Sequence, residues 1–338
     1  MCLLLALRAV PGAAQETVME PPRVGQIDYY GLRRIQPEKI QREAGLSIGM
    51  ALPPSQQGLV ERIAGIKDVV QASVEAVCCE GKRAVLYVGI EEKGGARFEI
   101  REPAASEGTP LLTEDMLDAY RHLLEAMNEA ARRGDTAEDI TRGHSLLRDE
   151  TARGWQLRLA QLAEPNLALL RQTLREGTEE ERAVAACVIG YAETKSAVVN
   201  DLQFALRDPD PTVRANALRS LVPIAKLAGD DAAFGARVEY TWIVEMLHSV
   251  FFQDRQNAVK ALLTLTETGG ERARKLVHER GLESLAEMAR WRHMPHALPA
   301  FLLLTRAAGM AEEEIQKQWV SGDRETAITK ILRESKTR

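Results

Sequence analysis

One stretch decides the fold of most of this chain: Asp208-Pro-Asp-Pro-Thr-Val-Arg-Ala-Asn-Ala-Leu-Arg-Ser-Leu221. Asp210 can accept hydrogen bonds from the free N–H groups at the start of a helix, and Pro211 suits the first helical position, where no N–H is needed. Apolar side chains then recur at helical spacing, at Val213, Ala217, Leu221 and Ile224. The stretch therefore predicts an amphipathic helix whose apolar face must pack against a neighbour.

The chain supplies that neighbour by repeating part of this stretch. Arg214-Ala-Asn-Ala-Leu-Arg-Ser-Leu221 returns as Arg255-Gln-Asn-Ala-Val-Lys-Ala-Leu262, and more loosely as Arg182-Ala-Val-Ala-Ala-Cys-Val-Ile-Gly190. The unequal intervals between the three copies are typical of helix pairs joined by loops of different length. These residues resemble the HEAT-repeat family from about Asn166 to the C-terminus. The resemblance implies an α-solenoid that binds other molecules through its surface.

The first arginine of each copy takes an equivalent position. We therefore expect Arg182, Arg214 and Arg255 to form a ladder along the stack of helices. In HEAT-like repeats such residues bond to neighbouring carboxylates or helix ends, so Asp208 is the expected partner of Arg214. We interpret this ladder as structural, because stacked units share bridging groups of this kind.

Length and composition limit the class of protein. At 338 residues the chain exceeds one typical domain. Its hydrophobic content of 45% with only 5% aromatic residues favours helices packed through small and medium side chains. The net charge of −5, spread along the chain, argues against nucleic acid as the main partner. No run reaches the ~18 apolar residues that a membrane-spanning helix needs.

The segment 1–20 predicts a signal for secretion. Leu3 to Leu7 are apolar, and small residues that end at Ala14 suit a cleavage site, although Arg8 interrupts the run and no basic segment precedes it. The prediction is therefore export to the periplasm or cell envelope, with a disordered tail of a cytoplasmic protein as the alternative. Cleavage would leave three cysteines with no disulfide framework spacing, Cys78, Cys79 and Cys187. We expect Cys187 to be a small buried helix residue.

Residues 24–92 have the pattern of a strand, two helices and two strands. Val24-Gly-Gln-Ile-Asp-Tyr-Tyr-Gly31 alternates and then stops at a glycine, as a strand does before a turn. Helices are expected at 37–44, before Gly45, and around Leu59, Ile63 and Ile66. Two further strands, at 69–77 and 84–91, are joined by a turn at 80–82. This order predicts a compact α+β unit.

This unit resembles a POTRA domain, the polypeptide-transport-associated module of bacterial envelope proteins. The matching features are Ile27-x-x-x-Gly31, the framework Ile40, Leu46, Gly49 and Leu52, the lead Ile66-x-x-Val69-Val70, and the closing Glu91-Glu92. The resemblance implies that an extended partner can add to the edge formed by the second strand, with Val70, Ala72, Val74 and Ala76 as candidate binding residues. The alternative is an edge that binds nothing and is protected by Glu75.

Two groups of residues have the composition of a chemical site. His144, Ser145 and Asp149 are the residue types of a hydrolytic triad, but no nucleophile turn surrounds Ser145, so we expect no catalysis there. His293-Met-Pro-His296 is the only metal-like spacing in the sequence. It lacks a third ligand, so we interpret it as a surface turn and predict no metal.

The predicted fold is thus an α+β, POTRA-like domain followed by an all-α, HEAT-like solenoid. The expected divisions are a signal and lead at 1–20, the POTRA-like domain at 21–93, a linker at 94–110, a helical connector at 111–154 and the solenoid at 155–338. We expect a non-enzymatic scaffold or adaptor of the bacterial cell envelope that binds proteins or peptides, without a cofactor, nucleic acid or membrane span. The alternatives are a HEAT-like enzyme, such as a bilin lyase or a DNA glycosylase, and a cytosolic scaffold. The acidic balance weakens the DNA alternative.

Overall fold

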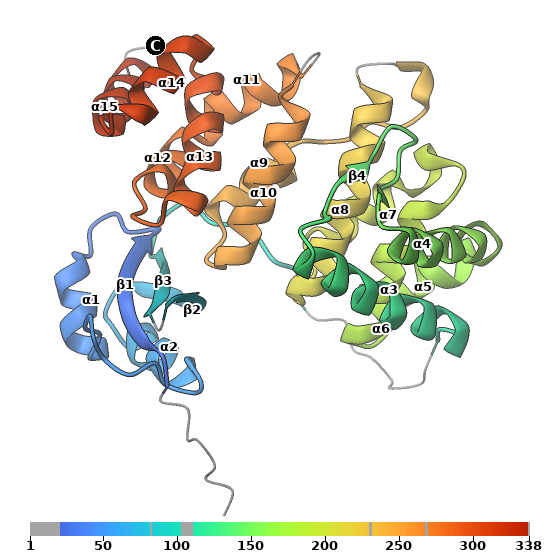
Figure 1. Ribbon diagram of the computed structural model, residues 1–338, viewed down its shortest axis with the longest axis horizontal. Coiled ribbons are helices and arrows are strands. Elements are labelled where there is room, and N and C mark those ends of the chain that lie inside the picture. The colour runs from blue at the N-terminus through green and yellow to red at the C-terminus, as the bar shows by residue number, and fades with distance from the viewer. Residues whose placement is uncertain (1–20, 82, 103–110, 230–231, 268–269, 337–338) are drawn as a thin grey trace, which may run out of the picture.

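The structure is a computed structural model that describes residues 21–81, 83–102, 111–229, 232–267 and 270–336. A small mixed sheet with two helices lies at the N-terminal end, and a largely helical region follows it (Figure 1). The predicted signal at 1–20 and positions 103–110 of the predicted linker lie outside the described residues, as do the side chains of Cys78 and Cys79.

The N-terminal sheet has three strands in the order β1-β3-β2, where β1 is Arg23–Tyr30, β2 is Val69–Glu80 and β3 is Arg83–Glu92. β1 runs parallel to β3, and β2 runs antiparallel to it. Helices α1 (Pro37–Ala44) and α2 (Gln57–Ala64) cover one face of this sheet and close a core around Ile40, Ile63 and Leu86. The predicted order of strand, helix, helix, strand and strand is confirmed.

The opposite face of the sheet is closed by the helical region. Tyr30 donates a hydrogen bond of 2.9 Å from its hydroxyl to the backbone oxygen of Val250. Gly89 lies so close to this segment that a Cβ there would stand 2.1 Å from the same Val250 oxygen. Tyr87 stacks on Phe252 with 4.1 Å between the ring centroids. The sheet is therefore buried on both faces, by chain segments that lie far apart in the sequence.

The region between the sheet and the repeats is partly β. Helix α3 (Glu114–Arg132) is followed by a two-stranded hairpin, β4 (Glu138–Asp139) and β5 (Leu146–Leu147), where the sequence predicts a helical connector. Helix α4 (Glu150–Ala163) is capped by Asp149, whose carboxylate accepts a hydrogen bond from the Ala152 N–H. The expected boundary between the helical connector and the solenoid, at residues 154 and 155, thus falls inside helix α4.

The remaining helices pack pairwise and continue to the C-terminus. They are α5 (Leu167–Glu176), α6 (Glu179–Val188), α7 (Val199–Ala205), α8 (Pro211–Ala228), α9 (Thr241–Glu245), α10 (Phe252–Leu265), α11 (Glu271–Arg280), α12 (Leu282–Ala289), α13 (Met294–Ala307), α14 (Glu312–Val320) and α15 (Arg324–Ser335). Helices α6, α8, α10 and α13 contact one another in succession, and α5, α7 and α9 pack beside α6, α8 and α10. None of the described helices is both long and apolar enough to cross a membrane.

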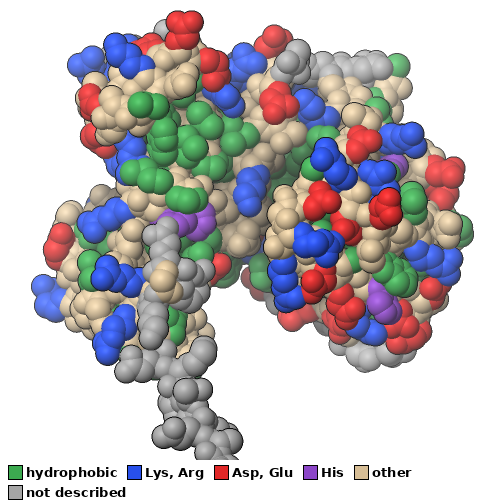
Figure 2. Space-filling model, in the orientation of Figure 1, with side chains coloured by type: hydrophobic (Ala, Val, Ile, Leu, Met, Phe, Trp, Pro, Cys, Tyr) green, Lys and Arg blue, Asp and Glu red, His purple; other side chains and the backbone are tan. Residues whose placement is uncertain are grey.

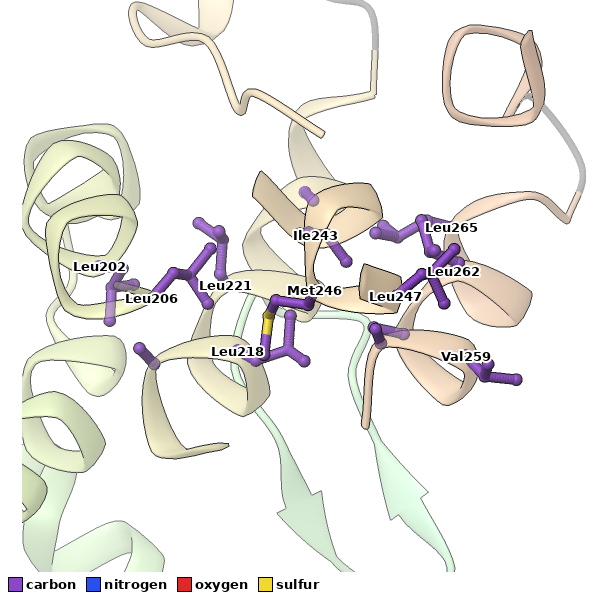
Figure 3. Packing of buried hydrophobic residues seen from close by; sticks show 14 of the residues in the cluster. Leu202, Leu206, Leu218, Leu221, Ile243, Met246, Leu247, Val259, Leu262 and Leu265 are labelled. Atoms are coloured by element: carbon purple, nitrogen blue, oxygen red, sulfur yellow. The ribbon is translucent and has the colours of Figure 1, made fainter. Parts of the chain in front are cut away.

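The helix start predicted at Asp210 is confirmed, and a second helix start is capped by side chains. Asp210 accepts hydrogen bonds from the N–H groups of Thr212 and Val213 at 2.8 and 2.9 Å. Thr178 and Glu181 form a capping box at the start of α6. Behind these caps the apolar stripes meet in one core. This core includes Leu221 of α8, Met246 of the turn after α9 and Leu262 of α10 (Figure 3).

Candidate binding surfaces

The outer edge of β2 is open along its central part. β2 pairs only with β3, and among the described residues no hydrogen bond joins positions 71–77 to any other segment. The edge of β1 differs, because the Val24 N–H donates to the Met50 oxygen at 2.9 Å and the Gly49 N–H donates to the Val24 oxygen at 2.7 Å. Of the two edges of this sheet, the edge of β2 is therefore the one that is open along the described positions 71–77.

The four candidate residues of that edge have different surroundings. Val70 has 56% of its surface exposed, whereas Ala72 and Val74 are each 8% exposed and pack in the core with α1 and α2. Ala76 is partly buried against the same core. Since three of the four side chains are largely enclosed, this edge can offer a partner mainly its backbone N–H and C=O groups.

The three ladder arginines each bind an acidic side chain that lies further along the chain. Arg182 donates from its Nε and Nη2 to the two carboxylate oxygens of Asp208, both at 2.9 Å. Arg214 binds Asp254 in the same two-pronged way, at 2.9 to 3.1 Å. Arg255 donates to Glu287 at 3.2 Å. All three guanidinium groups are almost completely buried, so their partners are needed to compensate the cost of removing the charge from water.

The expected pairing of Asp208 with Arg214 is wrong at the level of side chains. The Asp208 carboxylate binds Arg182 and also Arg101, which donates to it at 2.9 Å. Besides Asp254, Arg214 donates to the backbone oxygens of Asp208 and Pro209, each at 2.8 Å, and not to the Asp208 carboxylate. Each ladder arginine instead reaches forward along the chain. Arg182 and Arg214 bind acidic side chains at the start of the second helix of the next pair, Asp208 before α8 and Asp254 in the first turn of α10, and Arg255 binds Glu287 near the end of α12.

Glu287, the partner of the last ladder arginine, also binds the segment that follows β1 of the sheet. The Oε2 atom of Glu287 accepts hydrogen bonds from Arg255 and from the backbone N–H of Gly31, the latter at 3.1 Å. The guanidinium of Arg255 lies 4.5 Å from the centroid of the Tyr30 ring. Burial lowers the pKa of Arg255, and the charge of Glu287 opposes that effect. The sheet and the helices are thus linked by a buried network as well as by apolar contact.

A groove of about 620 Å³ lies between the β4–β5 hairpin and helices α8 and α10. Figure 2 shows this face hollowed between the part that carries the hairpin and the helices that follow α8. Its polar lining comes from Thr136, Glu138 and Ser145 at the hairpin, Asn216 and Arg219 of α8, and Asn257, Lys260 and Thr264 of α10. Sequence reasoning missed this groove as a site, because the hairpin wall is distant in the sequence from the helices.

The helical side of this groove nevertheless had a signal in the sequence. Asn216 and Asn257 are the third residues of the two similar octapeptides, and Arg219 and Lys260 are the sixth. Residues three apart lie on the same face of a helix. The repeat therefore places an amide and a cation together twice, on adjacent helices, and both pairs line the groove.

His144, Ser145 and Asp149, the residue types of a hydrolytic triad, each contact different partners. Ser145 donates a hydrogen bond to Glu138, and Asp149 caps α4 while binding Arg133 at 2.5 Å. The ring of His144 lies beside Tyr191, with 5.7 Å between centroids. Burial lowers the pKa of His144, and the nearby cations Lys195 and Arg142 act in the same direction. No hydrogen bond joins the three residues to one another in the described part of the chain.

The pair His293 and His296 is not in a surface turn, so that interpretation is wrong. His293 is the residue just before α13 and His296 lies in its first turn, because Pro295 takes an early helical position where it needs no N–H partner. His296 lies 2.6 Å from the Tyr87 hydroxyl through its Nδ1 and packs beside Phe252. Among the described residues no group of three or more potential ligands is placed to hold a metal ion.

Cys187 is buried, as the sequence predicts. Burial raises the pKa of its thiol to about 11, so the thiol is protonated near neutral pH and is a poor nucleophile.

We found no family model, no curated protein and no solved structure that matches this chain.

Proposed function

We propose that this chain is a non-enzymatic scaffold of the bacterial cell envelope that binds extended segments of other proteins. In this proposal the N-terminal unit is a POTRA-like domain and the helical region is a HEAT-like solenoid. The observation that carries the proposal is the open edge of β2, on a sheet whose two faces are both covered. Since the faces are occupied, the edge is the surface through which this sheet can bind a partner.

The close packing of the N-terminal sheet against the helical region supports the role of an adaptor. Tyr30, Tyr87 and Gly89 are packed against the helices, and Glu287 binds both regions. A partner strand at β2 and a partner on the helices would therefore be held in a fixed relation. A flexible linker between two domains would not provide this, because it leaves their orientation free.

The distribution of charge favours a protein partner over a nucleic acid. On the face shown in Figure 2 acidic and basic side chains are interspersed, without a continuous basic band. Binding to a phosphate backbone depends on several basic side chains acting together. Polypeptide partners require only backbone pairing and a few complementary side chains.

Peptide display on the full-length chain tests the proposal. Peptides of about 12 residues are selected for binding, and each amide of a selected peptide is then N-methylated in turn. In strand addition only alternate N–H groups of the added strand point toward the edge. We therefore expect loss of binding at every second position, together with slower hydrogen exchange of the amides at 71–77. Selected peptides without this alternation, or no selected peptide at all, would contradict strand addition.

Envelope location needs a separate test. Fractionation of the native host, followed by N-terminal sequencing of the mature chain, should recover a protein that lacks the predicted signal from the envelope fraction. Recovery of an uncleaved chain from the cytoplasm would remove the envelope proposal, and it would leave the binding proposal to stand on the display experiment.

A further inference from the structure

The groove between the hairpin and helices α8 and α10 differs from the β2 edge because side chains rather than backbone groups face the incoming molecule. We propose that this groove binds an extended polypeptide segment that carries acidic side chains. The inference rests on the proposed function and deepens it, since it names the chemistry of a partner for the helical region.

The charged side chains of the groove favour an acidic partner. Arg219 is bound by Glu138, which also accepts a hydrogen bond from Ser145. Lys260 is exposed, and its ammonium has no ion pair or hydrogen bond with any described residue. The polar lining thus holds two cations and one carboxylate, in a protein whose net charge is −5. A carboxylate on the partner would complete this arrangement at Lys260.

The side-chain amides of Asn216 and Asn257 can each make a further hydrogen bond to a bound peptide. The Nδ2 of Asn216 donates to the Tyr120 hydroxyl and to the Ala183 oxygen, both at 2.8 Å, so its Oδ1 remains to accept a hydrogen bond. The Oδ1 of Asn257 accepts from Gln253 at 2.9 Å, so its Nδ2 remains to donate. One acceptor and one donor complement the N–H and C=O groups of a peptide backbone.

The spacing of the amides fits an extended chain. Packed helices lie about 8–10 Å apart, and an extended chain advances about 3.3 Å per residue. Amides on adjacent helices are therefore separated by about three residues of an extended peptide. A nucleic acid fits the same groove less well, because one unpaired cation supplies little of the charge that a phosphate backbone requires.

The test is a differential selection. A library of random 12-residue peptides is displayed and selected in parallel on the full-length chain and on its Lys260→Glu variant. The matched control is Lys275→Glu, because Lys275 is an exposed lysine of α11 outside the groove. We expect peptides that prefer the wild-type chain over Lys260→Glu to be enriched in Asp and Glu. Each should bind Lys260→Glu about tenfold more weakly and bind Lys275→Glu unchanged.

Three results of the peptide selection would overturn the proposal. They are the absence of any peptide that discriminates between wild type and Lys260→Glu, a discriminating set without an excess of acidic residues, and an equal effect of Lys275→Glu. Binding of a 20-nucleotide single-stranded DNA that depends on Lys260 would overturn it in favour of nucleic acid. Thermal melting shows that the variants are folded.

The outcome separates this groove from the β2 edge. Peptides that bind wild type and Lys260→Glu equally, and that show alternating sensitivity to N-methylation, support strand addition while the groove proposal fails. Acidic peptides that depend on Lys260 but lack that alternation support the groove while strand addition fails.

Discussion

The Asp208 carboxylate lies 2.9 Å from both Nε and Nη2 of Arg182, and neither side chain has more than 4% of its surface exposed. This pair joins two neighbouring helix pairs, and Arg101 brings the segment after β3 to the same carboxylate. An ion pair in which arginine donates two parallel hydrogen bonds to one carboxylate is both strong and geometrically specific. The ladder therefore fixes the relation between successive helix pairs.

Removal of the Asp208 carboxylate should be strongly destabilising. Asp208→Ala leaves the buried cation of Arg182 without its counter-charge, and such a loss costs about 3–5 kcal/mol of the free energy of unfolding. Urea denaturation followed by circular dichroism measures this change. The control is Glu279→Ala, at an exposed pair with Lys275, which should change stability by less than about 0.5 kcal/mol. Equal effects of the two substitutions would show that the Asp208 pair is not structurally important.

Gly89 is expected to be intolerant of a side chain. A Cβ there would lie 2.1 Å from the Val250 oxygen and 2.6 Å from the Tyr30 ring, so Gly89→Ala should separate the sheet from the helices or unfold the chain. We expect a loss of at least about 2 kcal/mol, which is in the range of overpacked cores. Gly154→Ala is the control, because its added Cβ would meet no described atom within 4 Å beyond its chain neighbours and the backbone of its own helix, α4. This substitution should stabilise the helix slightly. Limited proteolysis and thermal melting report both effects. Unchanged melting of Gly89→Ala would refute the close packing.

His296 should make the protein less stable in mild acid. Burial, assisted by the charges of His293 and Lys260, lowers the pKa of His296 from its ordinary 6.5 to about 4. Between these two values the unfolded chain binds a proton that the folded chain does not, so the free energy of unfolding falls as the pH falls from 6.5 toward 4. Urea titrations at several pH values should show a smaller fall for His296→Gln than for wild type.

The matched control for His296 is His122→Gln, at an exposed position of α3. This variant should follow the wild-type pH dependence more closely than His296→Gln does. Asp28 and Glu75 also titrate near the interface, with pKa values raised mainly by burial, but both remain in all three proteins. If wild type and His296→Gln lose stability in parallel, the histidine is not the group responsible.

Glu92 should stabilise the turn after β1 through its charge. Its carboxylate accepts hydrogen bonds from the backbone N–H groups of Arg33, Arg34 and Ile35 at 2.7 to 3.1 Å. Burial acts to raise the pKa of Glu92, but these donors and the charge of Arg34 outweigh it and lower the pKa. Glu92→Gln removes the charge and turns an NH₂ group toward other donors, so we expect a loss of about 2 kcal/mol at pH 7.

The loss at Glu92 should shrink as the pH falls below about 4.5. A carboxylate whose pKa is lowered on folding contributes its stability above the unfolded pKa, and this contribution disappears in acid. Denaturation of Glu92→Gln and of the exposed control Glu43→Gln at pH 7 and at pH 3.5 measures the difference. A constant difference between wild type and Glu92→Gln across this range would exclude the charge as the cause.

Local features were readable from the sequence because they depend on near neighbours. The Asp210 cap and the Thr178 capping box involve residues two or three positions apart, and the strands and helices of 24–92 follow from periodicity. The equivalent positions of Arg182, Arg214 and Arg255 follow from the repeat alone. The β4–β5 hairpin was missed because two-residue strands leave little periodicity to detect.

The sequence by itself determined the order of strands and helices in residues 24–92, the start and the apolar face of α8, and which arginines are equivalent. Only the tertiary structure decided that Asp208 binds Arg182, that the first turn of α13 closes over Tyr87, and that the hairpin builds one wall of the groove. The physical reason is range: caps and amphipathic stripes are set within a few residues, whereas a buried charge finds its partner among segments that only folding brings together.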